Sequence, residues 1–273
     1  MEKAIKRYFP IFVLPTMIAF TLGFIIPFVE GVYLSFCKFT TVNDAKFVGF
    51  ANYAKVFTDE TFVHAFWYTA AFTVVSVILI NVLAFAVALL LTKGFKGTNI
   101  FRTVFFMPNL IGGIVLGYIW QLLLNGILMK FSRTLTYSST YGFWGLIILM
   151  CWQQIGYMMI IYIAGIQNIP GELIEAAEID GATKWQILKK VTIPMVMPSI
   201  TVCTFLTLTN SFKLFDQNLA LTNGEPSKMS EMLALNIFNT FYGRTGYEGV
   251  GQAKAVIFFI LVTVIALTQN YLT

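Results

Sequence analysis

Acidic side chains gather in one short segment of the chain. Four of the 13 acidic residues lie within Glu172–Asp180, inside the stretch from Ile169 to Pro194. Pro170 suits the first turn of a helix, and carboxylates such as Glu175 are stabilised near a helix's positive end. The carboxylates of such an exposed, acidic helix are suited to ion pairing with basic groups of a partner.

A second short helix is predicted in the same segment. Gly181 interrupts the first helix, and Thr183 with Gln186 has the spacing of a capping box that starts the next one. Lys189 and Lys190 complement its negative carboxyl end. An amphipathic loop of this kind could lie on lipid. Because the anionic inner leaflet would repel the acidic helix, we favour a docking surface for a cytoplasmic partner.

Polar side chains also recur inside the apolar stretches of the chain. In a membrane each one costs free energy unless it is paired or faces water, so each is a candidate for substrate contact. Amides, hydroxyls and aromatic rings suit a sugar, whose apolar ring faces are edged by hydroxyl groups, better than an ion path. The candidates are Asn109, Gln153, Gln154, Tyr157, Thr207, Asn210, Ser211 and Lys213.

Other roles for these residues stay open. Polar groups of this kind also hold helices together in membrane bundles, and Gly113 and Gly117 have the spacing of a close-packing site. Lys213 either pairs with Asp216, three residues further on, or anchors an anionic sugar such as a uronate.

Metal and catalytic chemistry is not indicated. His64 is the single histidine, and the three cysteines form no CxxC pair, so we expect no metal site and no catalytic residue. Gly94–Thr98 superficially resembles a phosphate loop but lacks the order GxxxxGK[ST]. We therefore expect no cofactor in this chain.

Membrane-spanning helices must position these groups. Of the 273 residues, 58% are hydrophobic and 11% are charged, whereas soluble domains have about 25% charged residues. Six stretches supply the roughly 20 apolar residues that cross a bilayer, and lipid forces each into a helix. We predict a single all-α membrane domain over residues 1–273, with a first span that is retained rather than cleaved. The predicted spans are Ile11–Phe36, Ala65–Leu91, Val104–Leu124, Gly142–Ile166, Val196–Phe215 and Gln252–Tyr271.

The basic residues predict the orientation of these spans. The amino terminus, the second loop and the fourth loop are richer in lysine and arginine than the other three loops, by about twofold per residue. The positive-inside rule therefore places both termini and the fourth loop in the cytoplasm. The chain stops at Thr273 without a basic tail, and we expect a few further native residues.

The fourth loop resembles a family motif. Glu175-Ala176-Ala177, then Gly181, and after nine residues Val191, Ile193 and Pro194, match the pattern EAA-x3-G-x9-I-x-LP with two conservative replacements. That motif marks the permease subunits of binding-protein-dependent ABC importers.

Three further segments resemble the sugar-importer branch of that family. They are Asp180–Ala182 in the fourth loop, Phe101–Pro108 before the third span, and Phe215-Asp216 followed by Leu221–Pro226. Their order is similar to that of the maltose-type "F" permease. The resemblance covers about residues 52–260.

The resemblance implies the type I ABC importer permease fold, with six transmembrane helices and a cytoplasmic coupling loop at residues 167–195. It implies a prokaryotic inner or plasma membrane protein that forms half of a heterodimeric pathway for a carbohydrate such as an oligosaccharide. The implied partners are a second permease, two ATPases that bind ATP and magnesium, and an extracytoplasmic solute-binding protein, but no nucleic acid. The residues implied in coupling are Glu175, Ala176, Ala177, Asp180 and Gly181.

Two other functions are weighed against this one. An ion-coupled secondary transporter of a polar solute needs embedded carboxylates, for which Asp216 and Glu30 are the candidates. A membrane enzyme is disfavoured because the chain has one isolated histidine and no clustered acids suited to catalysis.

Overall fold

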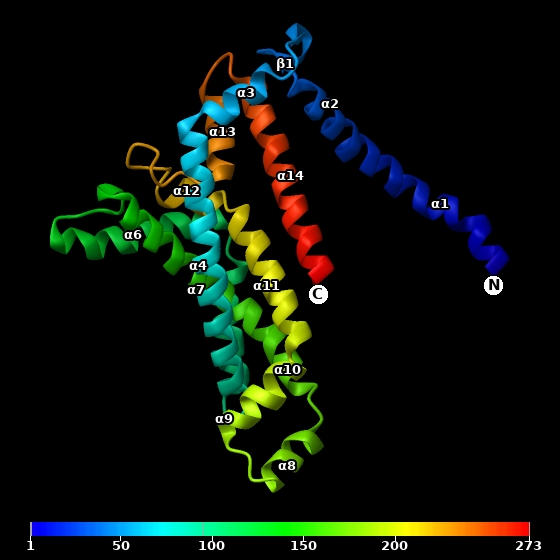
Figure 1. Cartoon of the computed structure of the whole chain (residues 1–273), viewed down its shortest axis with the longest axis vertical. Helices are drawn as coiled ribbons and strands as arrows, with labels where there is room; N and C mark the ends of the chain where they lie inside the picture. The colour runs from blue at the N-terminus through cyan, green and yellow to red at the C-terminus, as the bar shows by residue number, and fades with distance from the viewer. Residues whose placement is uncertain (1, 95, 273) are drawn as a thin grey trace. The chain divides into compact units, whose positions relative to one another are not determined.

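The computed structural model describes residues 2–94 and 96–272 of a largely helical protein (Figure 1). Its residues fall into two compact units. The first holds the chain up to Glu60 together with Ile237–Leu261, and the second holds Thr61–Asn236 together with the residues from Val262 onward. The helices α13 (Leu233–Gly243) and α14 (Glu248–Leu272) contribute residues to both units, and Glu60, the first residue of α4 (Glu60–Leu91), belongs to the first unit.

The first unit begins with a long apolar helix that changes its winding once. A π-helical turn at Thr21–Ile25 joins α1 (Glu2–Phe20) to α2 (Ile26–Leu34). Pro27, in the first turn of α2, lacks the N–H that a regular helix would donate, which accounts for the irregularity just before it.

A short polar hairpin follows α2 in the first unit. Strands β1 (Cys37–Lys38) and β2 (Lys46–Phe47) pair antiparallel, with a 3-10 turn at Val42–Asp44 between them, and α3 (Ala51–Thr58) comes next. The backbone N–H groups of Thr41 and Thr40 donate to the Asp44 carboxylate at 2.9 and 3.0 Å and hold the pKa of Asp44 below its usual range.

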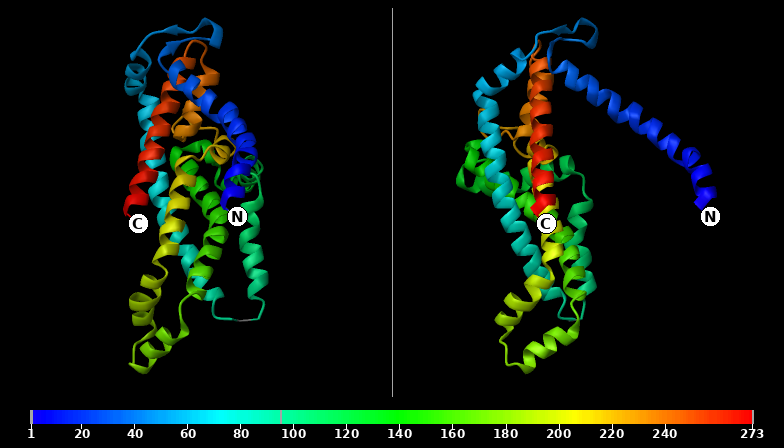
Figure 2. Two further views of the ribbon diagram at one scale, coloured as in Figure 1. Left: turned by 90° about the vertical axis from the view of Figure 1, so that its right-hand side faces the viewer. Right: turned by 45° about the vertical axis from the view of Figure 1, so that its right-hand side comes forward.

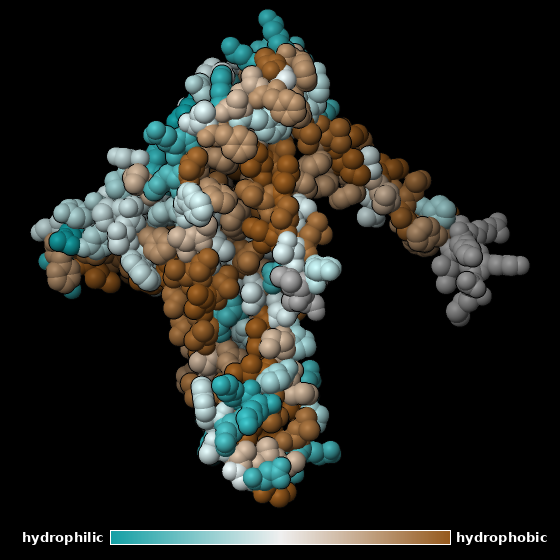
Figure 3. Space-filling model, viewed as in Figure 1, coloured by the Kyte–Doolittle hydropathy of each residue, from teal (hydrophilic) through white to brown (hydrophobic). Residues whose placement is uncertain are grey.

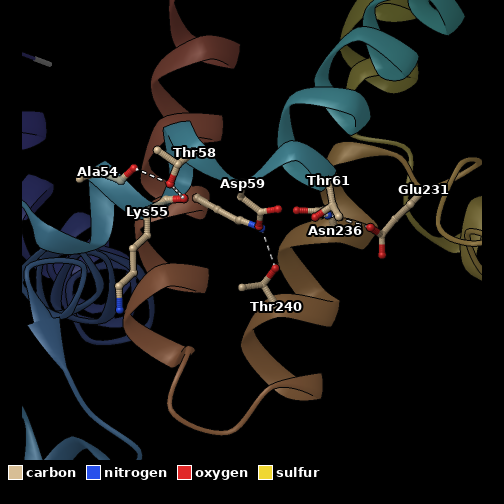
Figure 4. Close-up of polar contacts among 9 residues, drawn as sticks. Ala54, Lys55, Thr58, Asp59, Thr61, Glu231, Asn236 and Thr240 are labelled. Atoms are coloured by element: carbon tan, nitrogen blue, oxygen red, sulfur yellow. Dashed lines mark hydrogen bonds and ion pairs between the residues drawn. The ribbon is translucent and has the colours of Figure 1, made fainter.

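A buried ion pair joins three segments of the first unit. The Lys254 ammonium, in α14, lies 2.7 Å from Oδ2 of Asp59, the residue that follows α3. It also donates to Oγ1 of Thr240, in α13, at 2.8 Å. The Lys254 side chain is 0% exposed and that of Asp59 18% exposed. Figure 4 labels Asp59 and Thr240 and marks the hydrogen bond to the Thr240 hydroxyl with a dashed line.

The second unit is a helical bundle whose main helices are α4, α7 and α11 (Figures 1 and 2). Its core includes Phe72 and Ile80 from α4, Leu146 and Met158 from α7, and Cys203 from α11, all fully buried. Its helices are α4 (Glu60–Leu91), α5 (Thr98–Phe106), α6 (Gly113–Leu128), α7 (Ser139–Gln167), α8 (Gly171–Ile179), α9 (Lys184–Ile187), α10 (Ile193–Met195), α11 (Met197–Phe212) and α12 (Asp216–Leu221). Short 3-10 turns lie at Met107–Leu110, Met129–Phe131 and Leu135–Tyr137, and a π-helical turn at Leu188–Thr192.

The outer surface of this bundle is apolar along its length. Val74, Ile78 and Val82, spaced four residues apart on α4, are each 57–61% exposed. Figure 3 shows hydrophobic side chains over α4 and a mixture of hydrophilic and hydrophobic ones at the end that carries α8 and α9. An apolar stripe of this kind on a helix longer than 18 residues suits contact with lipid.

Among the described residues, five helical stretches are long and apolar enough to cross a membrane, and a bent pair adds a sixth. The pair, Lys184–Met195 and Met197–Phe212, is bent by 69° at Val196, where Pro198 cannot continue the hydrogen bonds of the preceding helix. The five are Phe9–Leu34, Glu60–Leu91, Gly113–Phe131, Ser139–Gln167 and Glu248–Gln269. The predicted all-α fold with six spans is therefore confirmed.

The third span is displaced from its predicted position. Val104–Leu124 was the expected range, but the spanning helix begins at Gly113 and continues to Phe131. A 3-10 turn that contains Pro108, and an extended Gly112, separate it from α5. Hydropathy alone merges the two segments, because α5 is itself apolar on much of its surface.

Candidate functional site

The coupling loop projects from one end of the second unit as two short helices, α8 and α9 (Figure 1). Pro170 precedes α8 rather than lying in its first turn, one residue earlier than predicted. The acidic residues of α8 are exposed, as are Ile179 (86% exposed) and Trp185 (69% exposed). An acidic surface with two large exposed apolar side chains is suited to protein contact.

Gly181 ends α8 in the left-handed conformation, with φ at +76°. Its N–H donates to the Glu178 carbonyl, and the Ala182 N–H donates to the Ala177 carbonyl, both at 3.0 Å. This pair of bonds is a Schellman motif, which satisfies the last carbonyls of the helix and favours glycine at this position. The predicted break at Gly181 is therefore present.

The predicted capping box is present at the start of α9, with Thr183 as the N-cap. The Gln186 N–H donates to Thr183 Oγ1 at 3.3 Å, and the Thr183 N–H donates to Gln186 Oε1 at 2.7 Å. These two bonds fix the turn between α8 and α9. The coupling loop thus contains backbone and side-chain hydrogen bonds of its own that fix its two turns.

An open polar cavity of about 300 Å³ lies in the second unit, between α7, α11 and the start of α12. Gln154 is 7% exposed, and its Oε1 is 3.5 Å from Nδ2 of Asn210. Lys213 is exposed and forms no ion pair with Asp216, so the first of the two roles left open for this lysine is not found. The lining residues are Met150, Gln154, Asn210, Lys213, Leu214, Phe215, Asp216 and Gln217.

Hydrogen bonds between side-chain amides connect one wall of this polar cavity to residues that do not line it. Gln217 donates through Nε2 to Oε1 of Gln153 at 2.8 Å, and Gln153 donates through Nε2 to the Ile111 carbonyl at 3.4 Å. The chain links α12, α7 and the segment before α6. Gln217, which the sequence analysis missed, therefore both lines the cavity and positions its wall.

Of the eight predicted substrate contacts, the structure brings Gln154, Asn210 and Lys213 together at the polar cavity. The other five, Asn109, Gln153, Tyr157, Thr207 and Ser211, do not line it.

Thr207 is fully buried in a separate network. Its hydroxyl donates to the Cys203 carbonyl at 2.7 Å and accepts from Asn81 Nδ2 at 3.3 Å, while Tyr162 donates to Asn81 Oδ1 at 2.7 Å. Ser211 is also fully buried, and its hydroxyl has no hydrogen-bond partner within the described residues. The network around Thr207 joins three helices, as polar residues in membrane bundles often do.

Gly113 and Gly117 form the predicted close-packing site. A Cβ on Gly113 would lie 2.7 Å from Cβ of Asp216, and one on Gly117 would lie 2.6 Å from Cβ of Ala220. The absent side chains allow α12 to lie directly against α6. Because Asp216 and Gln217 begin α12, this contact also fixes one wall of the polar cavity.

No group of His, Cys, Asp and Glu residues suited to a metal ion occurs within the described residues. His64 Nε2 instead lies 3.0 Å from the Met229 carbonyl.

Comparison with known proteins identifies the family. The model of the family described as "binding-protein-dependent transport system inner membrane component" matches residues 80–273, which is more than half of the chain and includes the coupling loop and the polar cavity. The chain belongs to this permease family. The predicted EAA-motif resemblance is confirmed.

Relatives and solved structures agree with this membership. The permease is 42% identical over 272 residues to the probable starch degradation products transport system permease protein AmyD of Thermoanaerobacterium thermosulfurigenes, covering 96% of this chain and 92% of that protein. It is 29% identical to the multiple sugar-binding transport system permease protein MsmF of Streptococcus mutans, covering 98% and 96%. Its fold is similar to a chain of a bacterial alginate ABC transporter in complex with an alginate pentasaccharide-bound periplasmic protein, at a TM-score of 0.81, 21% identity and 99% and 96% coverage.

The family assignment decides between the functions weighed from the sequence. The chain is a multi-pass membrane component of a transport system, and neither an ion-coupled secondary transporter nor a membrane enzyme finds support in its relatives.

Proposed function

We propose that this permease forms half of the translocation pathway of an ATP-driven ABC importer for carbohydrates, and specifically for oligosaccharides. The observation that carries the proposal is that this chain, a member of the permease family, has both an EAA-type coupling loop and an amide-lined cavity. AmyD and MsmF, which are named for starch degradation products and multiple sugars, support the carbohydrate class.

The proposed assembly contains a second, different permease, two cytoplasmic ATPases and an extracytoplasmic solute-binding protein. ATP and magnesium bind to the ATPases, and no cofactor binds to this chain. The alginate transporter, solved with a periplasmic protein, supports the last of these partners. With both termini in the cytoplasm, α8 and α9 face the ATPases, and the chain lies in a prokaryotic cell membrane.

The polar cavity is the proposed substrate site. Gln154 and Asn210 offer amide donors and acceptors to sugar hydroxyls, and Gln217 orients one wall. One lysine and one aspartate give the cavity a formal charge of zero, which favours a neutral sugar over a uronate. Its volume is at the lower end for ligand sites, so one sugar ring at a time is the expected occupant.

Replacing the coupling residues tests the function as a whole. In the reconstituted transporter, Glu175→Ala removes an exposed carboxylate, and Gly181→Ala forces a side chain into a left-handed conformation that costs about 1–2 kcal/mol. We expect each change to lower ATP-driven sugar uptake about tenfold or more, as measured with radiolabelled maltooligosaccharides.

Glu172→Ala is the matched control for that experiment, because Glu172 is exposed on the same helix but lies outside the motif. It should leave uptake within about twofold of wild type. Uptake that is ATP-driven but indifferent to both motif changes would overturn the proposed coupling. Uptake that follows a proton or sodium gradient without ATP would overturn the importer assignment.

Replacing Asn210 tests the proposed substrate site. Asn210→Leu removes an amide from the polar cavity, and a lost hydrogen bond of this kind changes a rate by about tenfold. We expect maximal uptake to fall by that factor while basal ATP hydrolysis by the complex stays unchanged. Thr209→Val on the same helix is the control, because the Thr209 hydroxyl donates to the Phe205 carbonyl at 2.8 Å and does not line the cavity. Equal uptake by both variants would contradict the site.

A further inference from the structure

A second cavity, of about 390 Å³, lies where α4, α5 and α7 approach one another in the second unit. Its lining combines Thr92 and Gly97 from the α4–α5 loop, Asn99 and Arg102 from α5, and Gln167 from the end of α7. None of these residues belongs to the polar cavity or to α8 and α9. We call it the Arg102 cavity.

Arg102 is the charged group that lines this cavity. Its Nε is shielded from solvent and has no hydrogen-bond partner within the described chain. Its Nη2 lies 3.5 Å from the Leu91 carbonyl oxygen, which is long for an N–H···O bond. A guanidinium presents five N–H donors in a planar fork, so Arg102 has donor capacity that the protein itself does not use.

The backbone beside Arg102 also favours an anion. Gly94 and Gly97 have φ values of +72° and +92°, and Gly97 immediately precedes α5 without a side-chain cap. The nine-residue helix α5 therefore presents its positive end at the cavity. Lys93 and Lys96 are exposed in the same loop and add positive charge to it.

The surface of α5 next to Arg102 is apolar. Ile100, Phe101 and Val104 are 69%, 48% and 57% exposed. A basic cavity bordered by exposed apolar side chains matches a molecule with an anionic head and hydrocarbon tails. A free inorganic anion has no apolar part that could contact these side chains.

We propose that the Arg102 cavity binds the phosphate of an anionic phospholipid from the cytoplasmic leaflet. Arg102 donates to two phosphate oxygens, the geometry in which a guanidinium binds phosphate most tightly. Basic pockets between helices on the cytoplasmic side of membrane proteins bind acidic headgroups in this way. The assignment to this leaflet rests on the proposed orientation of the permease, whereas binding itself depends on neither orientation nor transport.

Native mass spectrometry of the purified transporter complex tests the proposal. The complex is delipidated in detergent and then incubated with phosphatidylglycerol or with phosphatidylcholine of the same chain length. We expect the wild type to retain phosphatidylglycerol in preference to phosphatidylcholine by about tenfold, and Arg102→Gln to lose most of that preference. Arg133→Gln, at an arginine next to Tyr137 and Tyr141 and outside this cavity, should retain it.

Two further controls distinguish a lipid phosphate from free phosphate and separate a loss of binding from a loss of folding. Millimolar inorganic phosphate that displaces phosphatidylglycerol would overturn the lipid assignment in favour of a free anion. Arg102→Lys keeps the charge and the aliphatic stem but not the fork, so it should show an intermediate preference even if Arg102→Gln fails to fold. A wild type that shows no preference for phosphatidylglycerol, or arginine variants that retain it fully, would overturn the site. None of these measurements depends on sugar uptake. Lipid binding at the Arg102 cavity can therefore be tested even if the proposed transport function is wrong.

Discussion

Replacing Lys254 by methionine, or Asp59 by asparagine, is expected to destabilise the permease by about 3–5 kcal/mol, the usual cost of leaving one member of a buried ion pair without its partner. Lys254 is fully buried and bonds at 2.7 Å to Asp59 and at 2.8 Å to Thr240. Removing either charge leaves the other in surroundings that solvate it poorly. The free energy of unfolding in mixed micelles, followed by circular dichroism, measures the effect.

A double-mutant cycle separates the interaction from the burial of each charge. The double variant Asp59→Asn/Lys254→Met leaves no unpaired charge at this site, so its loss of stability should be smaller than the sum of the two single losses by about 2 kcal/mol or more. Lys55→Met is the control, because Lys55 is exposed on α3 and lies 5.7 Å from the Tyr247 ring. It should cost less than about 1 kcal/mol. Additive losses in the double variant would show that the ion pair contributes nothing.

Gly156→Ala is expected to have an effect of similar size for a steric reason. A Cβ on Gly156 would lie 1.8 Å from the Phe105 carbonyl oxygen and 2.2 Å from its carbon. Both atoms belong to the backbone, so α5 and α7 would have to separate. Overpacking costs about 1–3 kcal/mol when side chains can move, and here we expect the upper end of that range or more.

Gly126→Ala, in α6, is the matched control for Gly156→Ala. A Cβ at Gly126 meets nothing within 4 Å, and alanine is the better helix former by up to about 1 kcal/mol. This variant should therefore be neutral or slightly more stable in the same unfolding measurement. A Gly156→Ala protein as stable as wild type would mean that α5 and α7 do not approach as closely as described. Gly156 also precedes Tyr157 by one residue, so transport by any folded fraction is a useful second readout.

The sequence predicted those features of the permease that depend on local chemistry. The capping box at Thr183, the break at Gly181 and the close packing at Gly113 and Gly117 each follow from residue type and spacing, and each is present. The number of spans was also predictable, because a bilayer imposes the same length on every helix.

The positions of polar side chains around each helix were harder to predict. Thr207 and Asn210 are three residues apart, about one turn of α11, yet Thr207 bonds to Asn81 whereas Asn210 lines the polar cavity. Periodicity defines a face but not what that face contacts. Lys213 lies inside an apolar stretch of the sequence, but in the structure it lies just past the end of α11, where its side chain is exposed.

Lys254 shows the opposite failure of sequence reasoning. It lies inside the stretch predicted as the sixth span, whose high mean hydropathy concealed a single charge. Its partner Asp59 is 195 residues away and outside every predicted span. Only the packing of α14 against the end of α3 reveals the pair, and no local signal in either segment indicates it.

The 69° bend at Val196 has a mechanical consequence for the proposed importer. If the segment Lys184–Met195 is displaced along its own axis, the component along α11 is only about 0.36 of that displacement, the cosine of 69°. The larger component, about 0.93, is perpendicular to α11 and tilts it. Asn210 is near the far end of α11, so a tilt of α11 displaces Asn210 and the wall of the polar cavity laterally. An axial displacement of Lys184–Met195 at the membrane surface therefore moves this wall mainly within the membrane plane rather than along α11.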